Sequence, residues 1–194
     1  MVEIKKRTWA IFALILAVIL IPLIFAVPFF VRSTWFSPGY AHHGQLVRPP
    51  VGMRVVGLAP PATTVPLPAN YFKGHWTLVY IGGSRCGADC KAALYAMRQA
   101  RIATGEHMRQ VQRLYVVPRG RPPQAGLAAN WPGLTIEVAT GVVGAHFVHQ
   151  FTAVQSAGGI YIVDPNGLLM MTFSIHANPE GLVKDLRHLL DVNT

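Results

Sequence analysis

An apolar stretch near the N-terminus constrains this chain more than any other feature. No charged residue occurs between Thr8 and Val31, and Lys5-Lys6-Arg7 comes immediately before that stretch. A helix needs about 20 apolar residues to cross the hydrocarbon core of a bilayer, so we expect residues 8–31 to form one transmembrane helix. Basic residues favour the cytoplasmic side. This predicts a cytoplasmic end over residues 1–7 and a periplasmic location for the rest of a single-pass protein of the bacterial inner membrane.

A cleaved signal peptide is the alternative interpretation of the same stretch. Its apolar region would be shorter, about 7 to 15 residues, and a cleavage site with small residues would follow directly. Here Val27-Pro-Phe-Phe-Val-Arg follows instead, so a cut after Ala41 is less favoured than a retained anchor. In either case the rest of the chain reaches a compartment in which disulfides persist.

The remaining length suits a tether and one soluble domain. Residues 32–68 are rich in Pro, Gly, Ser and Thr without sustained periodicity, which predicts a tether with no more than one short strand. Residues 69–194 have the size of an ordinary domain. The chain carries 17 Lys and Arg against 8 Asp and Glu, a formal net charge of +9. This balance fits a basic surface facing anionic lipid, and we expect no nucleic-acid partner because no recognition motif for one occurs.

Residues 69–194 alternate between strand and helix patterns. The expected strands cover residues 76–81, 114–117, 134–138, 160–163 and 168–173, and the expected helices cover 89–105, 141–151 and 178–190. Asp164-Pro-Asn-Gly predicts a tight turn between the last two strands, and Asn178 predicts the N-cap of the last helix. A parallel βαβ start, a crossover, a hairpin and a terminal helix together predict an α/β, thioredoxin-like domain.

The only two cysteines lie where the strand at 76–81 gives way to the first helix of this domain. Cys86 would lie in the loop and Cys90 in the first helical turn, where free N–H groups and the helix dipole favour a thiolate. Arg85 and Lys91 add positive charge, which Asp89 opposes. The spacing puts the two α-carbons roughly 6 Å apart, within the range of a disulfide. The pair can therefore form a structural disulfide, exchange electrons with another dithiol, or ligate a soft metal such as copper.

A copper site built on two thiolates would be completed by a histidine. His146 and His149 are the candidates, because their segment leads into the strand at Ile160, which should pass near the cysteines. The two histidines are also one helical turn apart, which suits an ordinary surface face. Metal ligation by Cys86, Cys90 and one of these histidines thus stays open beside a surface role.

Several of these segments resemble the Sco/SenC family, the membrane-anchored, thioredoxin-like proteins of cytochrome c oxidase assembly. The matching features are the N-terminal anchor, Gly44-Gln-Leu-Val, Lys73-Gly-His-Trp-Thr-Leu-Val-Tyr-Ile-Gly-Gly, Cys86-x3-Cys90 and Tyr161-Ile-Val-Asp-Pro-Asn-Gly. The resemblance implies an accessory protein for the oxidase copper centre, with the copper-bearing oxidase subunit or another dithiol protein as its partner. It gives Cys86 and Cys90 the catalytic role in thiol-disulfide exchange, and it makes copper a candidate cofactor.

The chain departs from the family pattern at the third copper ligand. Alignment on Tyr161-Ile-Val-Asp-Pro-Asn-Gly puts Ser156 where the family has its copper-binding histidine, and Gly87 and Lys91 replace the prolines that follow the two cysteines. A divergent member is therefore expected, with thiol exchange favoured over tight copper binding. Two other hypotheses remain. One is a general periplasmic thiol-disulfide oxidoreductase, and the other is a non-catalytic, membrane-tethered interaction module with a structural disulfide.

Overall fold

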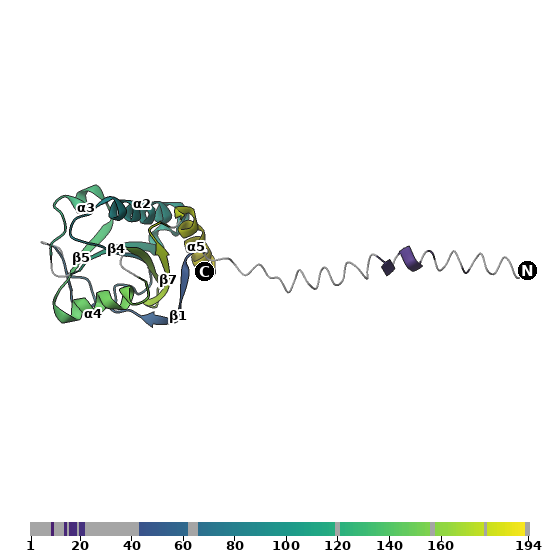
Figure 1. Ribbon diagram of the computed structural model, residues 1–194, viewed down its shortest axis with the longest axis horizontal. Helices are drawn as coiled ribbons and strands as arrows, with labels where there is room; N and C mark the ends of the chain where they lie inside the picture. Colours follow the sequence, from purple (N-terminus) through teal and green to yellow (C-terminus); the bar gives the residue numbers. More distant parts are fainter. Residues whose placement is uncertain are drawn as a thin grey trace, which may run out of the picture. The chain divides into compact units, whose positions relative to one another are not determined.

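The computed structural model describes residues 9, 14, 16–18, 20–21, 43–61, 66–118, 121–155, 158–176 and 178–192 (Figure 1). The chain divides into two compact units, Met1–Ala41 and His42–Thr194. The described residues of the first unit are helical. Most of the predicted transmembrane helix, the basic residues 1–7 and the segment around Ala41 lie outside the described residues. In the described part of the chain, no helix is both long and apolar enough to cross a membrane.

The second unit is built on one seven-stranded sheet with the strand order β1-β7-β6-β3-β4-β5-β2. Strands β3, β4 and β5 run parallel, and β6, β7, β1 and β2 join the sheet by antiparallel pairing. The elements in chain order are β1 (Gln45–Gly52), β2 (Leu58–Ala59), β3 (Trp76–Ile81), α2 (Ala88–Ala103), η1 (Gly105–Gln110), β4 (Val111–Val117), α3 (Leu127–Asn130), β5 (Leu134–Ala139), α4 (Gly141–Thr152), β6 (Gly159–Val163), β7 (Leu168–Ser174) and α5 (Pro179–Val192).

The five strands and three helices that the sequence predicts are all present, and their ends differ by a few residues. All six residues of β3 are buried, as expected of a strand covered on both faces. The predicted turn is formed by a hydrogen bond from the Gly167 N–H to the Asp164 carbonyl, with Gly167 at φ 82°. The Asp164 carboxylate also accepts the Asn166 and Leu168 N–H groups, which fixes the hairpin between β6 and β7.

Each face of the sheet carries its own hydrophobic core. One core joins α2, α3 and α5 to the sheet and includes Cys86 and Cys90, whereas the other joins α4 to the opposite face through Phe147 and Phe151. Figure 1 shows α2, α3 and α5 above the sheet and α4 below it. Because side chains alternate along a strand, Tyr80 of β3 faces the first core and Val79 faces the second. The cysteines and α4 are therefore on opposite sides of the sheet.

Strands β1 and β2 lie within residues 32–68, which the sequence suggested to be a tether with one short strand. Instead β1 pairs with β7 at one edge of the sheet and β2 pairs with β5 at the other. The sequence pattern hides β1 because it contains Arg48-Pro49-Pro50, and only Val47 of its eight residues is buried. An edge strand tolerates proline, since one side of its backbone makes no ladder hydrogen bonds.

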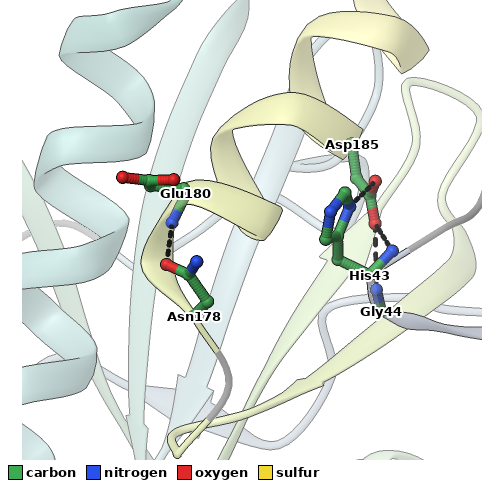
Figure 2. Close-up of polar contacts among 5 residues, drawn as sticks. All are labelled: His43, Gly44, Asn178, Glu180 and Asp185. Atoms are coloured by element: carbon green, nitrogen blue, oxygen red, sulfur yellow. Dashed lines mark hydrogen bonds and ion pairs between the residues drawn. The ribbon is translucent and has the colours of Figure 1, made fainter.

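The C-terminal helix α5 holds the segment that leads into β1 (Figure 2). The Asp185 carboxylate, which is fully buried, accepts the backbone N–H groups of His43 at 2.8 Å and Gly44 at 2.9 Å. The His43 ring Nδ1 lies 3.2 Å from the other carboxylate oxygen. Asn178 caps the helix as predicted, because its side-chain oxygen accepts the Glu180 N–H at 3.0 Å. The start of β1 is thus attached to α5 by several polar contacts.

Candidate dithiol site

The loop between β3 and α2 positions the cysteines. A Cβ on Gly82 would lie 2.5 Å from the Tyr80 ring, so the chain can take this close turn only with glycine. Below the loop, the rings of Tyr80 and Tyr115 stack at 5.6 Å, and the Tyr115 hydroxyl donates a hydrogen bond to the Gly83 carbonyl. The Gly82 N–H also bonds to β4, at the Val116 carbonyl. These contacts fix where β3 ends and the cysteine loop begins.

Cys86 and Cys90 form a disulfide with their α-carbons 5.1 Å apart. As predicted from the sequence, Cys86 lies in the loop and Cys90 in the first turn of α2, which begins at Ala88. The N-cap residue Gly87 offers no side-chain hydrogen bond to that turn, so backbone N–H groups remain to stabilise negative charge. The side chains are buried, with exposed fractions of 6% for Cys86 and 5% for Cys90.

The charge around the disulfide is mixed but mainly positive. Arg85 and Lys91 are exposed beside it, and Asp89 is the acidic residue in the first turn of α2. Burial raises the pKa of Tyr80, and the negative charge of Asp89 raises it further. Burial likewise raises the pKa of Tyr115 to about 12. Both phenols therefore stay protonated and neutral at physiological pH, and they add no charge to the site.

A pocket of about 270 Å³ opens beside the disulfide. Cys86 lines this pocket, whereas Cys90 does not. The other lining residues come from the first turn of α2 and from the segment around α3: Lys91, Gln124, Leu127, Asn130 and Trp131. The Gln124 N–H bonds to the Ser84 carbonyl at 2.8 Å, which attaches this segment to the cysteine loop.

The sequence predicts the cysteines and Lys91 at this site, but it does not predict the residues of the opposite wall of the pocket. Leu127 and Trp131 lie in a stretch without strand or helix periodicity, and no spacing rule connects them to Cys86. The available signal was a single tryptophan placed between Asn130 and Pro132 in a glycine- and proline-rich loop. A large aromatic side chain in such a loop usually packs against a neighbouring element.

The structure does not bring His146 and His149 to the cysteines. Both are exposed residues of α4, on the other side of the sheet, and His146 lines a separate cavity of about 800 Å³ with Arg54 and Lys73. Strand β6 pairs with β3 near the cysteine loop, where Ile160 lies opposite Tyr80. However, α4, which carries both histidines and precedes β6 in the chain, packs on the opposite face of the sheet.

The described residues contain no group of three His, Cys, Asp or Glu side chains that could hold a metal ion. Ser156, which aligns with the expected copper-binding histidine, lies outside the described residues. Among the described residues, the metal donors at this site are thus the two sulfurs. Once reduced, two thiolates suit a soft ion such as Cu(I), whereas a Cu(II) site of two cysteines and one histidine finds no third ligand among the described histidines.

Fold and site together define a thioredoxin-like protein with a Cys-x3-Cys disulfide at the start of its first domain helix. The chain belongs to the family of transmembrane-like, thioredoxin-like C-terminal domains, whose model matches residues 76–193. No curated protein matches the chain in sequence.

Its fold is that of Sco proteins. Yeast Sco1 with copper bound superposes with a TM-score of 0.53 at 16% identity, over 62% of this chain and 81% of that one. A SCO1/SenC family lipoprotein from Bacillus anthracis gives 0.53 at 15% identity, over 74% and 99% of the two chains. A putative electron transfer protein from Aquifex aeolicus gives 0.52 at 11% identity, over 71% and 96%. At these identities the similarity shows the fold alone.

Proposed function

We propose that this protein is a membrane-anchored, Sco-like accessory factor for cytochrome c oxidase assembly that acts by thiol-disulfide exchange at Cys86 and Cys90. The observation that carries the proposal is the disulfide at the N-terminal turn of α2, with Cys86 in the lining of a pocket. Residues 8–31 would anchor the domain in the bacterial inner membrane, with residues 1–7 in the cytoplasm and the domain in the periplasm. The Sco fold supports the assignment to oxidase assembly.

The exchange transfers two electrons from a dithiol to a disulfide. A thiolate of a donor dithiol attacks the Cys86 sulfur, the bond between the two sulfurs breaks, and Cys90 leaves as a thiolate that the helix N-terminus and Lys91 stabilise. The second donor thiolate then resolves the mixed disulfide, which leaves the donor oxidised and this protein reduced. By the reverse reaction the reduced pair converts a disulfide of the copper-bearing oxidase subunit into two thiols. Because thiolates are the form that ligates copper, this reduction would prepare that subunit for its metal.

Copper enters this proposal as cargo. The reduced cysteine pair can hold Cu(I) through two thiolates, and its donor set predicts weaker binding of Cu(II) than a site with a histidine ligand would show. A titration of the reduced protein with Cu(I) and Cu(II) tests this directly. Tight Cu(II) binding would overturn our preference for thiol exchange over copper delivery.

The test of the function is a double variant, Cys86→Ser with Cys90→Ser, in cells that depend on this protein for oxidase assembly. We expect loss of assembled oxidase while the variant accumulates to the wild-type level. Full assembly with the variant would overturn the proposal and leave a structural role as the remaining explanation of the disulfide. The reduction potential of the purified protein is the second measurement, since a value far below about −300 mV marks an inert structural bond.

A further inference from the structure

A row of basic side chains runs along α2 from the disulfide. Lys91, Arg98 and Arg101 follow one another at spacings of seven and three residues, which places them on one face of the helix. Lys91 lines the pocket beside Cys86, and Arg98 is exposed. The Arg101 Nε donates to the Val111 carbonyl at 2.7 Å, which holds this side chain over the start of β4. We call Lys91, Arg98 and Arg101 the basic face of α2.

Arg113 adds a buried positive charge beneath this basic face. It lies on β4, its exposed fraction is 2%, and its Nη2 donates to the Pro132 carbonyl at 2.6 Å. Its Nε and Nη1 are buried without a hydrogen-bond partner among the described residues. Burial lowers the pKa of Arg113, and the positive charges of Arg101 and Arg98 lower it further. A buried guanidinium with unpaired N–H groups is costly, and two further cations raise that cost.

Several of the described acidic side chains bind other groups or face away from this charge. Asp185 binds His43 and Gly44, and the Asp164 carboxylate closes the hairpin between β6 and β7. Glu137 is buried on β5, whose alternate residues Ile136 and Val138 belong to the core under α2, so Glu137 points to the other face. The charge of Asp89 acts on Tyr80. Among the described residues, no carboxylate forms an ion pair with any member of the basic face.

We propose that the basic face of α2 is the docking surface for an acidic segment of the redox partner. This inference rests on the proposed function, because it places the acidic segment beside the thiol that exchanges with Cys86. Charge complementarity selects the occupant, since Lys91, Arg98 and Arg101 supply the cations that side chains of Asp and Glu would pair. The pocket next to Cys86, with Leu127 and Trp131 in its wall, accommodates an apolar side chain next to the partner's cysteine. The partner segment therefore combines a cysteine, an apolar neighbour and a run of acidic residues.

Two short peptides test the docking surface on the full chain in a non-ionic detergent. Both contain a serine in place of the cysteine, an apolar neighbour and a fluorescent label, and they differ only in carrying either four Asp and Glu or four Asn and Gln residues. We expect the acidic peptide to bind about ten-fold more tightly in low salt, by anisotropy, and to lose this advantage as salt screens the charges. Arg98→Gln and Lys91→Gln should each remove part of the preference, whereas Lys184→Gln, at an exposed position on α5, should not.

The cysteine-containing versions of the same peptides separate this proposal from the proposed function. We compare second-order rates at which the single peptide thiolate attacks the disulfide to form a mixed disulfide and release one protein thiolate, using the measured thiol pKa of each peptide, and expect the acidic peptide to react several-fold faster. Equal binding and equal rates for the two peptides would overturn the docking surface while the exchange stands. Failure of both peptides and of dithiothreitol to reduce the disulfide would overturn the proposed function, and the anisotropy measurement would still decide the docking.

Anionic lipid is the competing occupant of the basic face. In a parallel experiment the domain of residues 42–194, which contains both hydrophobic cores, is mixed with phosphatidylglycerol vesicles. Binding to vesicles that Arg98→Gln abolishes, together with no preference for the acidic peptide, would overturn the proposal in favour of a lipid surface. Preference for the acidic peptide with vesicle binding that is independent of Arg98 would support it.

Discussion

Glu137 should make the stability of the domain depend on pH. This residue of β5 has an exposed fraction of 2%, and its Oε2 has no hydrogen-bond partner among the described residues. Burial raises the pKa of the Glu137 carboxyl from 4.5 to about 7. Burial is the cause of this shift, and β5 turns Glu137 away from the basic face of α2. The folded domain therefore keeps a proton on Glu137 that the unfolded chain releases.

The sign and size of the effect follow from this difference in pKa. Below about pH 4.5 the carboxyl is protonated in both states, so the stability of the neutral form is fully present. As the pH rises towards 7, only the unfolded chain has lost its proton, and the free energy of unfolding falls. Above the folded pKa the loss is complete. A pKa difference of about 2.5, at about 1.4 kcal/mol for each pH unit, gives a loss of at most about 3.5 kcal/mol.

The variant Glu137→Gln removes the titration and keeps the shape of the side chain. We expect urea unfolding of residues 42–194 between pH 5 and pH 8 to show a fall in the free energy of unfolding for the wild type. This fall should be smaller by up to about 3.5 kcal/mol in the variant. Glu106→Gln, at an exposed position, is the matched control and should follow the wild type. If Glu137→Gln keeps the full pH dependence, the argument from burial is wrong.

Three further substitutions test contacts that hold the domain together. Asp185→Ala removes the acceptor of the contacts with His43 and should lower the free energy of unfolding by about 2 to 3 kcal/mol, measured by urea unfolding. Gly181→Ala should lower the free energy of unfolding by about 1 to 3 kcal/mol in the same assay, because the added Cβ would lie 2.5 Å from the His43 Cβ. In the control Gly52→Ala the added Cβ has no atom within 4 Å, so the free energy of unfolding should fall by under about 1 kcal/mol. Tyr115→Phe removes the hydrogen bond to the cysteine loop, and we expect a loss of about 1 kcal/mol and faster reduction of the disulfide by dithiothreitol. An unchanged reduction rate in that variant would show that the hydroxyl does not restrain the loop.

The central strands and the helices could be predicted because each has a local signal. Residues 76–81 are continuously apolar, and α5 begins at an Asn-Pro-Glu sequence that caps a helix. The edge strand β1 has no such signal, because it buries one side chain and pairs with β7, more than a hundred residues later. The position of β1 depends on tertiary contacts. One of them is the hydrogen bond that the Gly44 N–H, just before β1, donates to the Asp185 carboxylate.

The residues of the candidate site also differ in whether a local sequence signal predicts their position. The position of Cys86 and Cys90 follows from the junction of one strand and one helix, so the sequence sufficed to place them. Whether His146 faces them depends on which side of the sheet the crossover through α4 covers, and periodicity does not contain that information. Trp131 reaches the pocket through a loop held by Gln124 and Ser84, a contact between segments 40 residues apart.

The size of the disulfide loop bears on what the bond is for. Closing a loop of only a few residues removes little entropy from the unfolded chain, about 2 kcal/mol in the chain-entropy model. Helix α2 is already attached to the sheet by the buried side chains of Ala93, Leu94 and Met97, none of which depends on the bond. The stability of the fold therefore depends little on the disulfide. Its place at a helix N-terminus, next to a pocket that Cys86 lines and Cys90 does not, and beside a basic face that forms no ion pair with a carboxylate among the described residues, is better explained by exchange with another protein than by stability.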